Sequence, residues 1–180
     1  MRESGEIRLL AEEDWDAVAA LEQRAYAADG LHEGEEVLRS RHRTSPSTCF
    51  VLEYEGKFGG YLLALPYPLG LCPDLSLVEE REAAGSNLHL HDLVIAERVR
   101  GRGLARRMHA HLSTAGRAAG YRTSSLVAVH STEGMWSALG YRARPGTSLP
   151  SSYGRNAIYM TQELFGSHRR PISTASASPR

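Results

Sequence analysis

The stretch LHDLVIAERVRGRGLARR, residues 90–107, joins an apolar strand to an arginine- and glycine-rich turn and then to a helix. The first backbone N–H groups of a helix have no partner within it, and the helix dipole favours an anion at that end. Glycine lets a ligand approach such groups closely. Five arginines in the stretch add positive charge. The segment therefore predicts a phosphate site, and a diphosphate fits it best.

Length and charge limit what the rest of the chain can do. A chain of 180 residues is long enough for one domain with a single core. Its 21 basic residues are balanced by 21 acidic ones, so the positive charge at the turn is a local feature. A protein that binds nucleic acid over a broad face is usually basic overall. The zero net charge and the lack of aromatic interleaving therefore argue against a nucleic-acid partner.

Cysteine spacing and hydropathy bear on location. Neither Cys49 nor Cys72 lies in a CxxC motif, so the sequence favours two free thiols in a reducing compartment over a disulfide framework or a zinc ribbon. No apolar run has the length of a membrane span, so no membrane association is expected. The residues after Met1 are polar rather than a signal-peptide core, so we expect a cytoplasmic protein.

The pattern of apolar residues predicts a mixed sheet flanked by helices on both faces, in the α/β (α+β) class. Residues 66–87, rich in proline and glycine, read as a long loop. We expect residues 1–165 to form the domain and 166–180 to be a disordered tail. The expected strands are Glu6–Leu10, Thr48–Tyr54, Phe58–Leu65, Leu88–Ile95, Ser124–Val129, Tyr141–Ala143 and Ala157–Gln162, and the expected helices are Asp14–Tyr26, Gly34–Arg43, Leu104–Ala119 and Thr132–Leu139.

The motif at the turn separates this phosphate site from two better-known ones. No Gly-Lys-[Ser/Thr] follows, so it is not a Walker A loop, and the GxGxxG spacing of a dinucleotide fingerprint is missing. Residues 100–105, RGRGLA, do match [Q/R]-x-x-G-x-[G/A]. A strand at 126–129 and the segment WSALGY at 136–141 follow the helix. In this context the chain resembles the GNAT (Gcn5-related) acyl-CoA N-acyltransferases from about Glu6 to Leu164.

The resemblance implies a single domain with a mostly antiparallel sheet of six to seven strands, and acetyl-CoA as co-substrate. Backbone groups of the fourth strand would pair with the pantetheine arm, because an extended amide-bearing chain can add beside a strand. The turn and helix start would hold the diphosphate. The residues implied in cofactor binding are Leu93, Val94, Ile95, Arg100, Gly101, Arg102, Gly103, Leu104, Ala105 and Arg106.

Two positions depart from the family pattern. Trp136 stands where the family often has a tyrosine that acts as general acid, and an indole cannot protonate a leaving thiolate. Val129-His130-Ser131 stands where the family often has an asparagine near the cofactor. The acid must therefore come from elsewhere or from water.

Asp92 is the first candidate for chemistry on the amine. It lies within an otherwise apolar strand, where an unpaired buried carboxylate is costly. A substrate ammonium would compensate it, and the resemblance places an acidic amine-binding residue of polyamine-acetylating relatives here. The alternative is a structural aspartate paired with an arginine.

Histidines and a tyrosine supply the other catalytic candidates. His89 and His91 share one face of the strand by alternation, and histidine titrates near neutrality. The resemblance aligns His89 with the glutamate base of histone-acetylating relatives, although a satisfied core histidine is the alternative for both. Tyr153 has a phenol that would replace the missing acid, unless it is an ordinary loop residue. His130 and Ser131 are weaker candidates for that role. No third ligand accompanies the two histidines, so no metal is expected.

These observations predict direct transfer of an acetyl group from acetyl-CoA to a primary amine of a small molecule, such as an amino acid, a polyamine or another metabolite. Neither cysteine lies in the motif, which disfavours a covalent intermediate. The acceptor side would include Tyr26, His32, Glu35 and Glu36, unless the glutamates form a solvated face. Alternatives are a protein N-terminal or lysine acetyltransferase and a catalytically silent CoA-binding regulatory domain. Family analogy also allows a homodimer.

Overall fold

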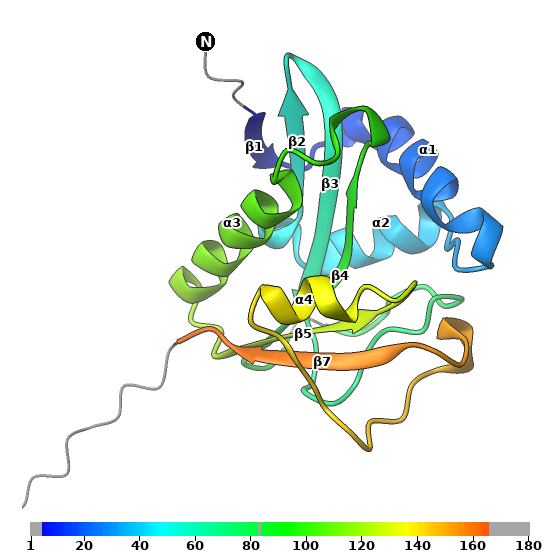
Figure 1. The fold of residues 1–180 in the computed structure, drawn as a ribbon, viewed down its shortest axis with the longest axis vertical. Coiled ribbons are helices and arrows are strands. Elements are labelled where there is room, and N and C mark those ends of the chain that lie inside the picture. Colours follow the sequence, from blue (N-terminus) through cyan, green and yellow to red (C-terminus); the bar gives the residue numbers. More distant parts are fainter. Residues whose placement is uncertain (1–4, 83, 166–180) are drawn as a thin grey trace, which may run out of the picture.

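Seven strands form one sheet in a computed structural model that describes residues 5–82 and 84–165 (Figure 1). The strand order is β1-β2-β3-β4-β5-β7-β6, and every neighbouring pair is antiparallel except β4 and β5. The predicted mixed, mostly antiparallel sheet is therefore confirmed. The strands are β1 (Gly5–Leu9), β2 (Phe50–Tyr54), β3 (Lys57–Pro66), β4 (Asn87–Ile95), β5 (Thr123–Ala128), β6 (Arg142–Ala143) and β7 (Ile158–Glu163).

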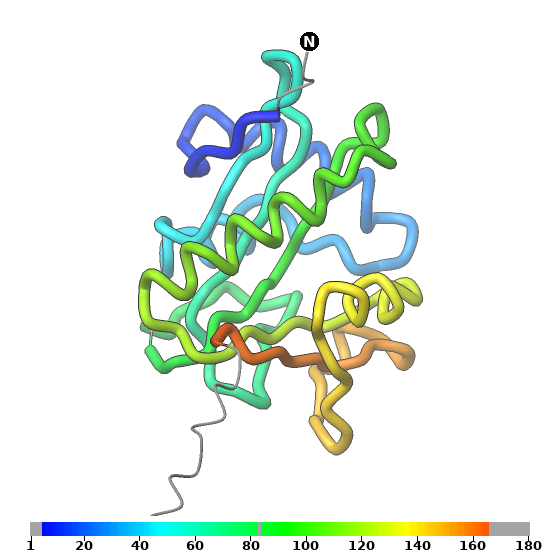
Figure 2. The backbone as a smooth tube through the Cα atoms, turned by 60° about the vertical axis from the view of Figure 1, so that its left-hand side comes forward, coloured from blue at the N-terminus to red at the C-terminus, as the bar shows by residue number. Residues whose placement is uncertain are grey.

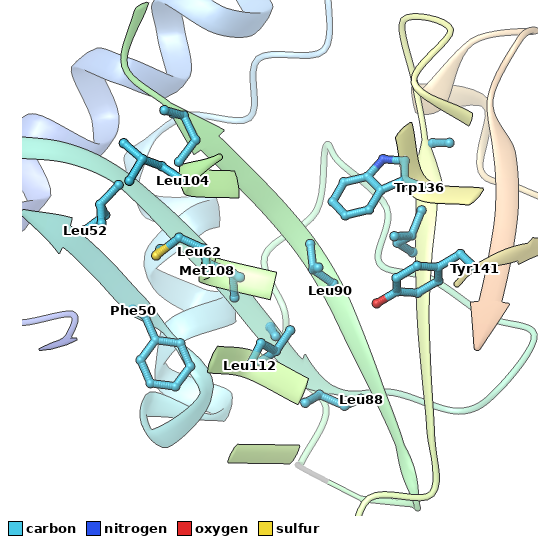
Figure 3. Packing of buried hydrophobic residues seen from close by; sticks show 14 of the residues in the cluster. Phe50, Leu52, Leu62, Leu88, Leu90, Leu104, Met108, Leu112, Trp136 and Tyr141 are labelled. Carbon is cyan, nitrogen blue, oxygen red and sulfur yellow. The ribbon is translucent and has the colours of Figure 1, made fainter. Parts of the chain in front are cut away.

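Helices cover both faces of the sheet, as the sequence predicted (Figures 1 and 2). They are α1 (Trp15–Tyr26), α2 (Glu35–Thr44), α3 (Leu104–Ala118) and α4 (Glu133–Ala138). One core contains side chains of α1 and α2, such as Trp15 and Leu38, packed on β2 and β3. The second core contains α3 residues, and Figure 3 shows Leu90 of β4 between Leu112 and Trp136 in it. The sheet thus separates two apolar layers.

The helix α3 buries polar residues as well as its apolar stripe. Its apolar residues pack on the sheet, but His109 and Ser113 are buried as well. Gln162 Nε2 of β7 lies 2.9 Å from His109 Nε2, which gives this buried imidazole a polar partner. The strand β7 thus offers a hydrogen-bonding neighbour that a helical pattern alone does not reveal.

A β-bulge interrupts the pairing of β3 with β4. Leu63 pairs with Asp92 and Ala64 with Leu90, so His91 is the extra residue. Successive side chains of a regular strand point to opposite faces, and an extra residue breaks this alternation. His91 and Asp92 therefore both point to the face covered by α1 and α2, where they contact Glu33 and Tyr26.

Several sequence expectations concern the boundaries of the domain. The long segment predicted at 66–87 lies between β3 and β4, although its first and last residues belong to those strands. Cys49 and Cys72 are both free and buried. In residues 5–82 and 84–165, no helix is both long and apolar enough to cross a membrane. The predicted tail at 166–180 lies outside the described residues.

Candidate functional site

The strands β4 and β5 run together for only part of their length. They pair in parallel from Asn87–Thr123 to His89–Ser125, and beyond this point the described part of β4 pairs with β3 alone. Figure 1 shows the two strands diverging from there. The edge of β4 that faces β5 at residues 93–95 is consequently without a strand partner in the described structure. It is available to an extended ligand that carries amides.

A cavity of about 130 Å³ lies where the strands diverge. Its wall comes from β4 at residues 90–93, from the end of β5, from α4, and from Tyr26 and Tyr153. A second cavity, of about 440 Å³, shares Leu31, Val129, His130 and Tyr153 with the first and is also lined by Arg155. The opening in the sheet thus leads to two adjoining spaces.

Asp92 lies in the wall of the smaller cavity and is only 6% exposed. The Tyr26 hydroxyl donates a hydrogen bond to Oδ1 at 2.7 Å, and the Tyr61 hydroxyl donates one to Oδ2. Burial raises the pKa of Asp92 to about 6, although both phenols act in the opposite direction. The carboxyl is therefore ionised just above pH 6 and is suited to exchange a proton near neutrality.

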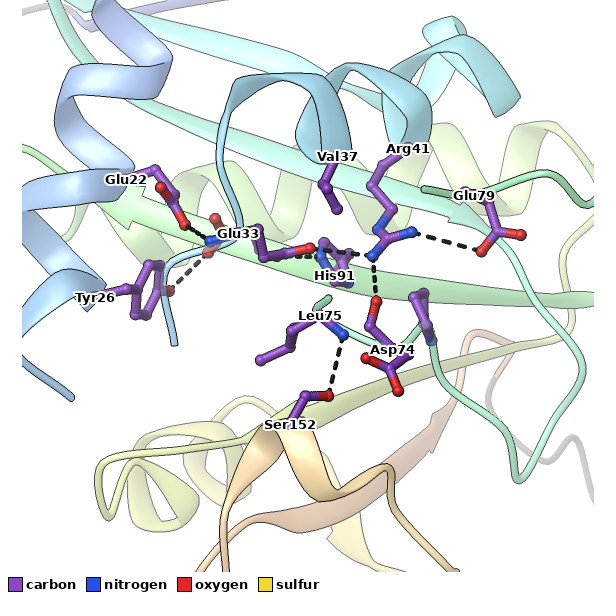
Figure 4. Close-up of polar contacts among 12 residues, drawn as sticks. Glu22, Tyr26, Glu33, Val37, Arg41, Asp74, Leu75, Glu79, His91 and Ser152 are labelled. Atoms are coloured by element: carbon purple, nitrogen blue, oxygen red, sulfur yellow. Dashed lines mark hydrogen bonds and ion pairs between the residues drawn. The ribbon is translucent and has the colours of Figure 1, made fainter. Parts of the chain in front are cut away.

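His91 is held by an ionic network rather than exposed in the cavity. Its side chain is 1% exposed, and its Nε2 lies 2.7 Å from Glu33 Oε1. Arg41 NH2 lies 3.1 Å from the other oxygen of Glu33 and donates to the Asp74 carbonyl at 2.7 Å (Figure 4). Glu79 lies 3.7 Å from Arg41 NH1. Since the whole of His91 is half-buried while its side chain is sealed, its exposed atoms belong to the main chain.

His89 is not among the residues that line the smaller cavity. Its side chain is buried, is absent from the described cavity lining, and has its Nδ1 2.9 Å from the Ser125 hydroxyl. Burial, and then the nearby His91 and Arg41, lower its pKa well below the usual 6.5. The face shared by His89 and His91 was predicted correctly, since the two rings lie 6.1 Å apart. Their catalytic roles stay predictions, and the surroundings of both rings are those of packed histidines.

The Tyr153 hydroxyl already donates its proton to a hydrogen bond within the protein. It lines both cavities, but its hydroxyl donates to the Pro73 carbonyl at 2.9 Å. Burial raises its pKa well above 10, with Cys72 adding to the effect. The role of Tyr153 as general acid stays a prediction, and it would require this bond to break.

The two departures from the family pattern lie on α4 and just after β5, where both elements border the cavities. Trp136 is buried in the cavity wall, packed edge-on against Tyr141 with ring centroids 5.8 Å apart. His130 and Ser131, at the end of β5, have φ of 54° and 59°. Non-glycine residues seldom adopt this left-handed conformation, and they do so more often at functional sites. His130 Nε2 lies 3.1 Å from Asp29 Oδ2.

The predicted phosphate turn has the open geometry that a ligand needs. Gly101 and Gly103 have φ of 76° and 72°, and a Cβ built on either would meet no atom within 4 Å. Gly103 caps α3, and no described side chain bonds to that end of the helix. The N–H groups of the first turn, from Leu104 to Arg106, are therefore free of intrahelical partners. A diphosphate bound at this turn, as the sequence predicts, would meet these free N–H groups.

Arginines brace this turn from outside. Arg100 Nε donates to the Ile95 carbonyl at 3.0 Å, and Arg98 NH2 donates to Phe58 at 2.6 Å. Arg102 donates to the Tyr54 hydroxyl at 3.2 Å and stacks on that ring. These bonds give the loop a fixed shape while leaving Arg100, Arg102 and the exposed Arg106 near the helix start.

Sequence reasoning identified only some of the residues that line the smaller cavity or contact its wall. Of the suggested residues, Tyr26 does line the cavity. His32 pairs instead with Glu22, while Glu35 and Glu36 pair with Arg39 and Arg43. Tyr61, Glu33 and Arg41 were missed. A buried arginine within a helix of mostly polar residues carries no signal in the sequence, because the contacts that bury it come from distant loops.

The comparisons with known proteins identify the family of this chain. Residues 15–141 match the model of the acetyltransferase (GNAT) family. The chain belongs to this family. No curated protein matches it. Among the residues that the structure describes, no group of three or more histidine, cysteine, aspartate or glutamate side chains is placed to hold a metal ion.

Solved structures share the GNAT fold at low identity. N-acetylglutamate synthase from Neisseria gonorrhoeae, complexed with coenzyme A and N-acetyl-glutamate, is 19% identical with a TM-score of 0.69, covering 92% of this chain and 36% of that chain. PaiA N-acetyltransferase from Thermoplasma acidophilum, in complex with coenzyme A, is 11% identical with a TM-score of 0.63, covering 89% and 99%. The GphF GNAT-like decarboxylase, in complex with isobutyryl-CoA, is 19% identical with a TM-score of 0.74, covering 89% and 100%. At these identities the likeness shows the fold alone.

Proposed function

We propose that this protein transfers an acetyl group from acetyl-CoA to a primary amine of a small molecule, by direct attack of the amine on the thioester. The observation that carries the proposal is Asp92, a buried carboxyl with a pKa of about 6 in the wall of the cavity at the β4–β5 opening. An amine must be neutral to attack, and a carboxylate that titrates near neutrality can hold its ammonium form and accept its proton.

Coenzyme A would lie along the edge of β4 and end at the start of α3. The unpaired edge at Leu93, Val94 and Ile95 would bind the pantetheine amides. The N–H groups after Gly103 would bind the diphosphate. When bound, acetyl-CoA supplies the activated acyl group. An N–H group of the exposed main chain at the His91 bulge would polarise its carbonyl, as backbone donors do in acyl transfer.

Charge and size favour a particular kind of amine. Asp92 and Glu33 both line the smaller cavity, and Arg41 offsets only one of these carboxylates. A carboxylate beside the reacting nitrogen would meet this negative charge. A cavity of about 130 Å³ is similar to the roughly 150 Å³ that holds a benzene. An amine on a short alkyl arm therefore fits better than an α-amino acid, with the polar body of the substrate in the adjoining cavity.

Thiol release from acetyl-CoA, measured with a panel of small amines, tests the proposal. We expect turnover with diamines and alkylamines above that with α-amino acids. Asp92→Asn should lower kcat/KM by roughly 100-fold or more. The matched control is Glu36→Gln, which removes an exposed carboxylate on α2 and should leave the rate unchanged. Binding of coenzyme A without turnover of any small amine or peptide would contradict the proposal and favour a regulatory domain.

Protein amines are the second candidate acceptor. The larger cavity is open and polar, lined by Ser151, Ser152 and Arg155, and an extended peptide could enter through it. The same assay separates this case. Peptides carrying a free N-terminus or a lysine would then react, while small amines would not.

A further inference from the structure

Tyr26, the last residue of α1, lies beside Asp92 in the wall of the smaller cavity. It lines the cavity and is partly exposed, whereas Asp92 is 6% exposed. Its hydroxyl lies 2.7 Å from Asp92 Oδ1. Its ring also faces His130 on the far side of the opening, with centroids 6.0 Å apart. Tyr26 therefore spans the space in which the acceptor amine would lie.

Both carboxylate oxygens of Asp92 already accept a hydrogen bond from a phenol. Tyr61, which is fully buried on β3, holds Oδ2 from the side of the core. Tyr26 holds Oδ1 from the side of the cavity. Both residues line the cavity, and Tyr26 is the more exposed of the two, so an amine in the cavity can approach the Tyr26 oxygen. A phenol can accept one proton while it donates its own.

We propose that Tyr26 is a catalytic residue that takes the proton of the acceptor amine and passes its own hydroxyl proton to Asp92. The inference rests on the proposed function. An N–H bond of the ammonium breaks, Tyr26 Oη gains that proton, and Asp92 Oδ1 gains the proton that Oη gives up. The nitrogen lone pair then attacks the thioester carbon, a C–N bond forms and the C–S bond breaks. The second nitrogen proton leaves with the sulfur as the thiol, and Asp92 returns its proton to solvent through Tyr26.

Other charged groups around Tyr26 do not provide this path. Burial raises the pKa of Tyr26, and Asp92, Glu33 and Glu22 add to the effect. Glu33 is, however, hydrogen-bonded to Arg41 and His91, and Glu22 to His32. His130 is paired with Asp29. The Tyr26 hydroxyl has its hydrogen bond to Asp92 alone among the described contacts that the structure gives it. The pair Tyr26–Asp92 is therefore the proton acceptor that this part of the cavity wall offers to an amine.

Tyr61 offers a matched control for the test. Tyr26→Phe and Tyr61→Phe each remove one phenol that bonds the same carboxylate, but only Tyr26 lines the cavity. Each phenol lowers the pKa of Asp92, so both variants should raise it. A ¹³C NMR titration of the Asp92 carboxyl measures this directly, and calorimetry with acetyl-CoA should show equal binding in both variants and the wild type.

Turnover of the amine then separates a proton carrier from a positioning residue. We expect Tyr26→Phe to lower kcat by roughly 100-fold or more at pH 7, and Tyr61→Phe by less than about 10-fold. The loss of kcat in Tyr26→Phe should shrink as the pH approaches the pKa of the amine, because a larger share of the amine is then already neutral and needs no proton removal. Equal losses in the two variants, or a Tyr26→Phe defect that does not change with pH, would overturn the inference. A wild type that acetylates no amine would instead refute the proposed function.

Discussion

At the scale of single residues, Asp92 shows how burial sets a chemical property. The carboxyl has two hydrogen-bond donors and still has a pKa of about 6, because burial outweighs both phenols. Its charged form is the one that can accept a proton. We therefore expect kcat/KM of the wild type to fall about tenfold for each pH unit below pH 6 and to level off above pH 6. Circular dichroism over the same range controls for unfolding. A rate that stays constant down to pH 5 would show that Asp92 is not the titrating base.

Tyr153 leads to the opposite expectation at the same scale. Its hydroxyl donates to the Pro73 carbonyl, so we expect it to anchor the loop between β3 and β4. We expect Tyr153→Phe to cost about 1–2 kcal/mol of unfolding free energy, since a buried carbonyl loses its donor, while kcat stays within about threefold. Urea denaturation and thiol release measure the two quantities. A loss of 100-fold in kcat at normal stability would make Tyr153 the general acid after all.

At the scale of elements, we place the proposed coenzyme site at the start of α3. Gly103 has φ of 72° and open space where a Cβ would go, and Gly120 after the same helix has φ of 86° and equally open space. Valine at either position is strained by the backbone. Only Gly103→Val also fills the space in front of the free N–H groups. We expect it to weaken binding of coenzyme A by tenfold or more in calorimetry, and Gly120→Val to leave binding unchanged. Equal affinities would contradict the assignment of this turn.

Arg41 of α2 joins elements that are far apart in the sequence. It is 1% exposed and contacts Glu33, Glu79 and the Asp74 carbonyl. Removing one member of a buried ionic network leaves the others uncompensated, which costs about 3–5 kcal/mol. We expect Arg41→Met to lower Tm by roughly 6–20 °C for a domain of this size. Arg43→Met removes the exposed pair with Glu36 on the same helix and should change stability by less than about 1 kcal/mol. Similar Tm values for the two variants would refute the anchoring role of Arg41.

At the scale of the whole molecule, the sequence predicted the sheet class and nearly every element, because apolar periodicity and the glycine breaks are local signals. It also predicted the strand, the glycine turn and the helix start at which the phosphate site is expected, since these three are contiguous. The bulge at His91 was not predictable, because it depends on how many residues of β3 face those of β4. Regular alternation would send Asp92 to the face opposite His91, away from Tyr26. The wall of the smaller cavity was therefore only partly readable, as it assembles from α1, β4, β5, α4 and loops.

A crystal structure of the protein with coenzyme A tests the central claim most directly. The account predicts the diphosphate on the N–H groups of residues 104–106, the pantetheine arm beside residues 93–95 of β4, and the thiol end in the cavity that Asp92 and Tyr26 border. Coenzyme A bound elsewhere on the molecule, with the β4–β5 opening filled only by water, would contradict it.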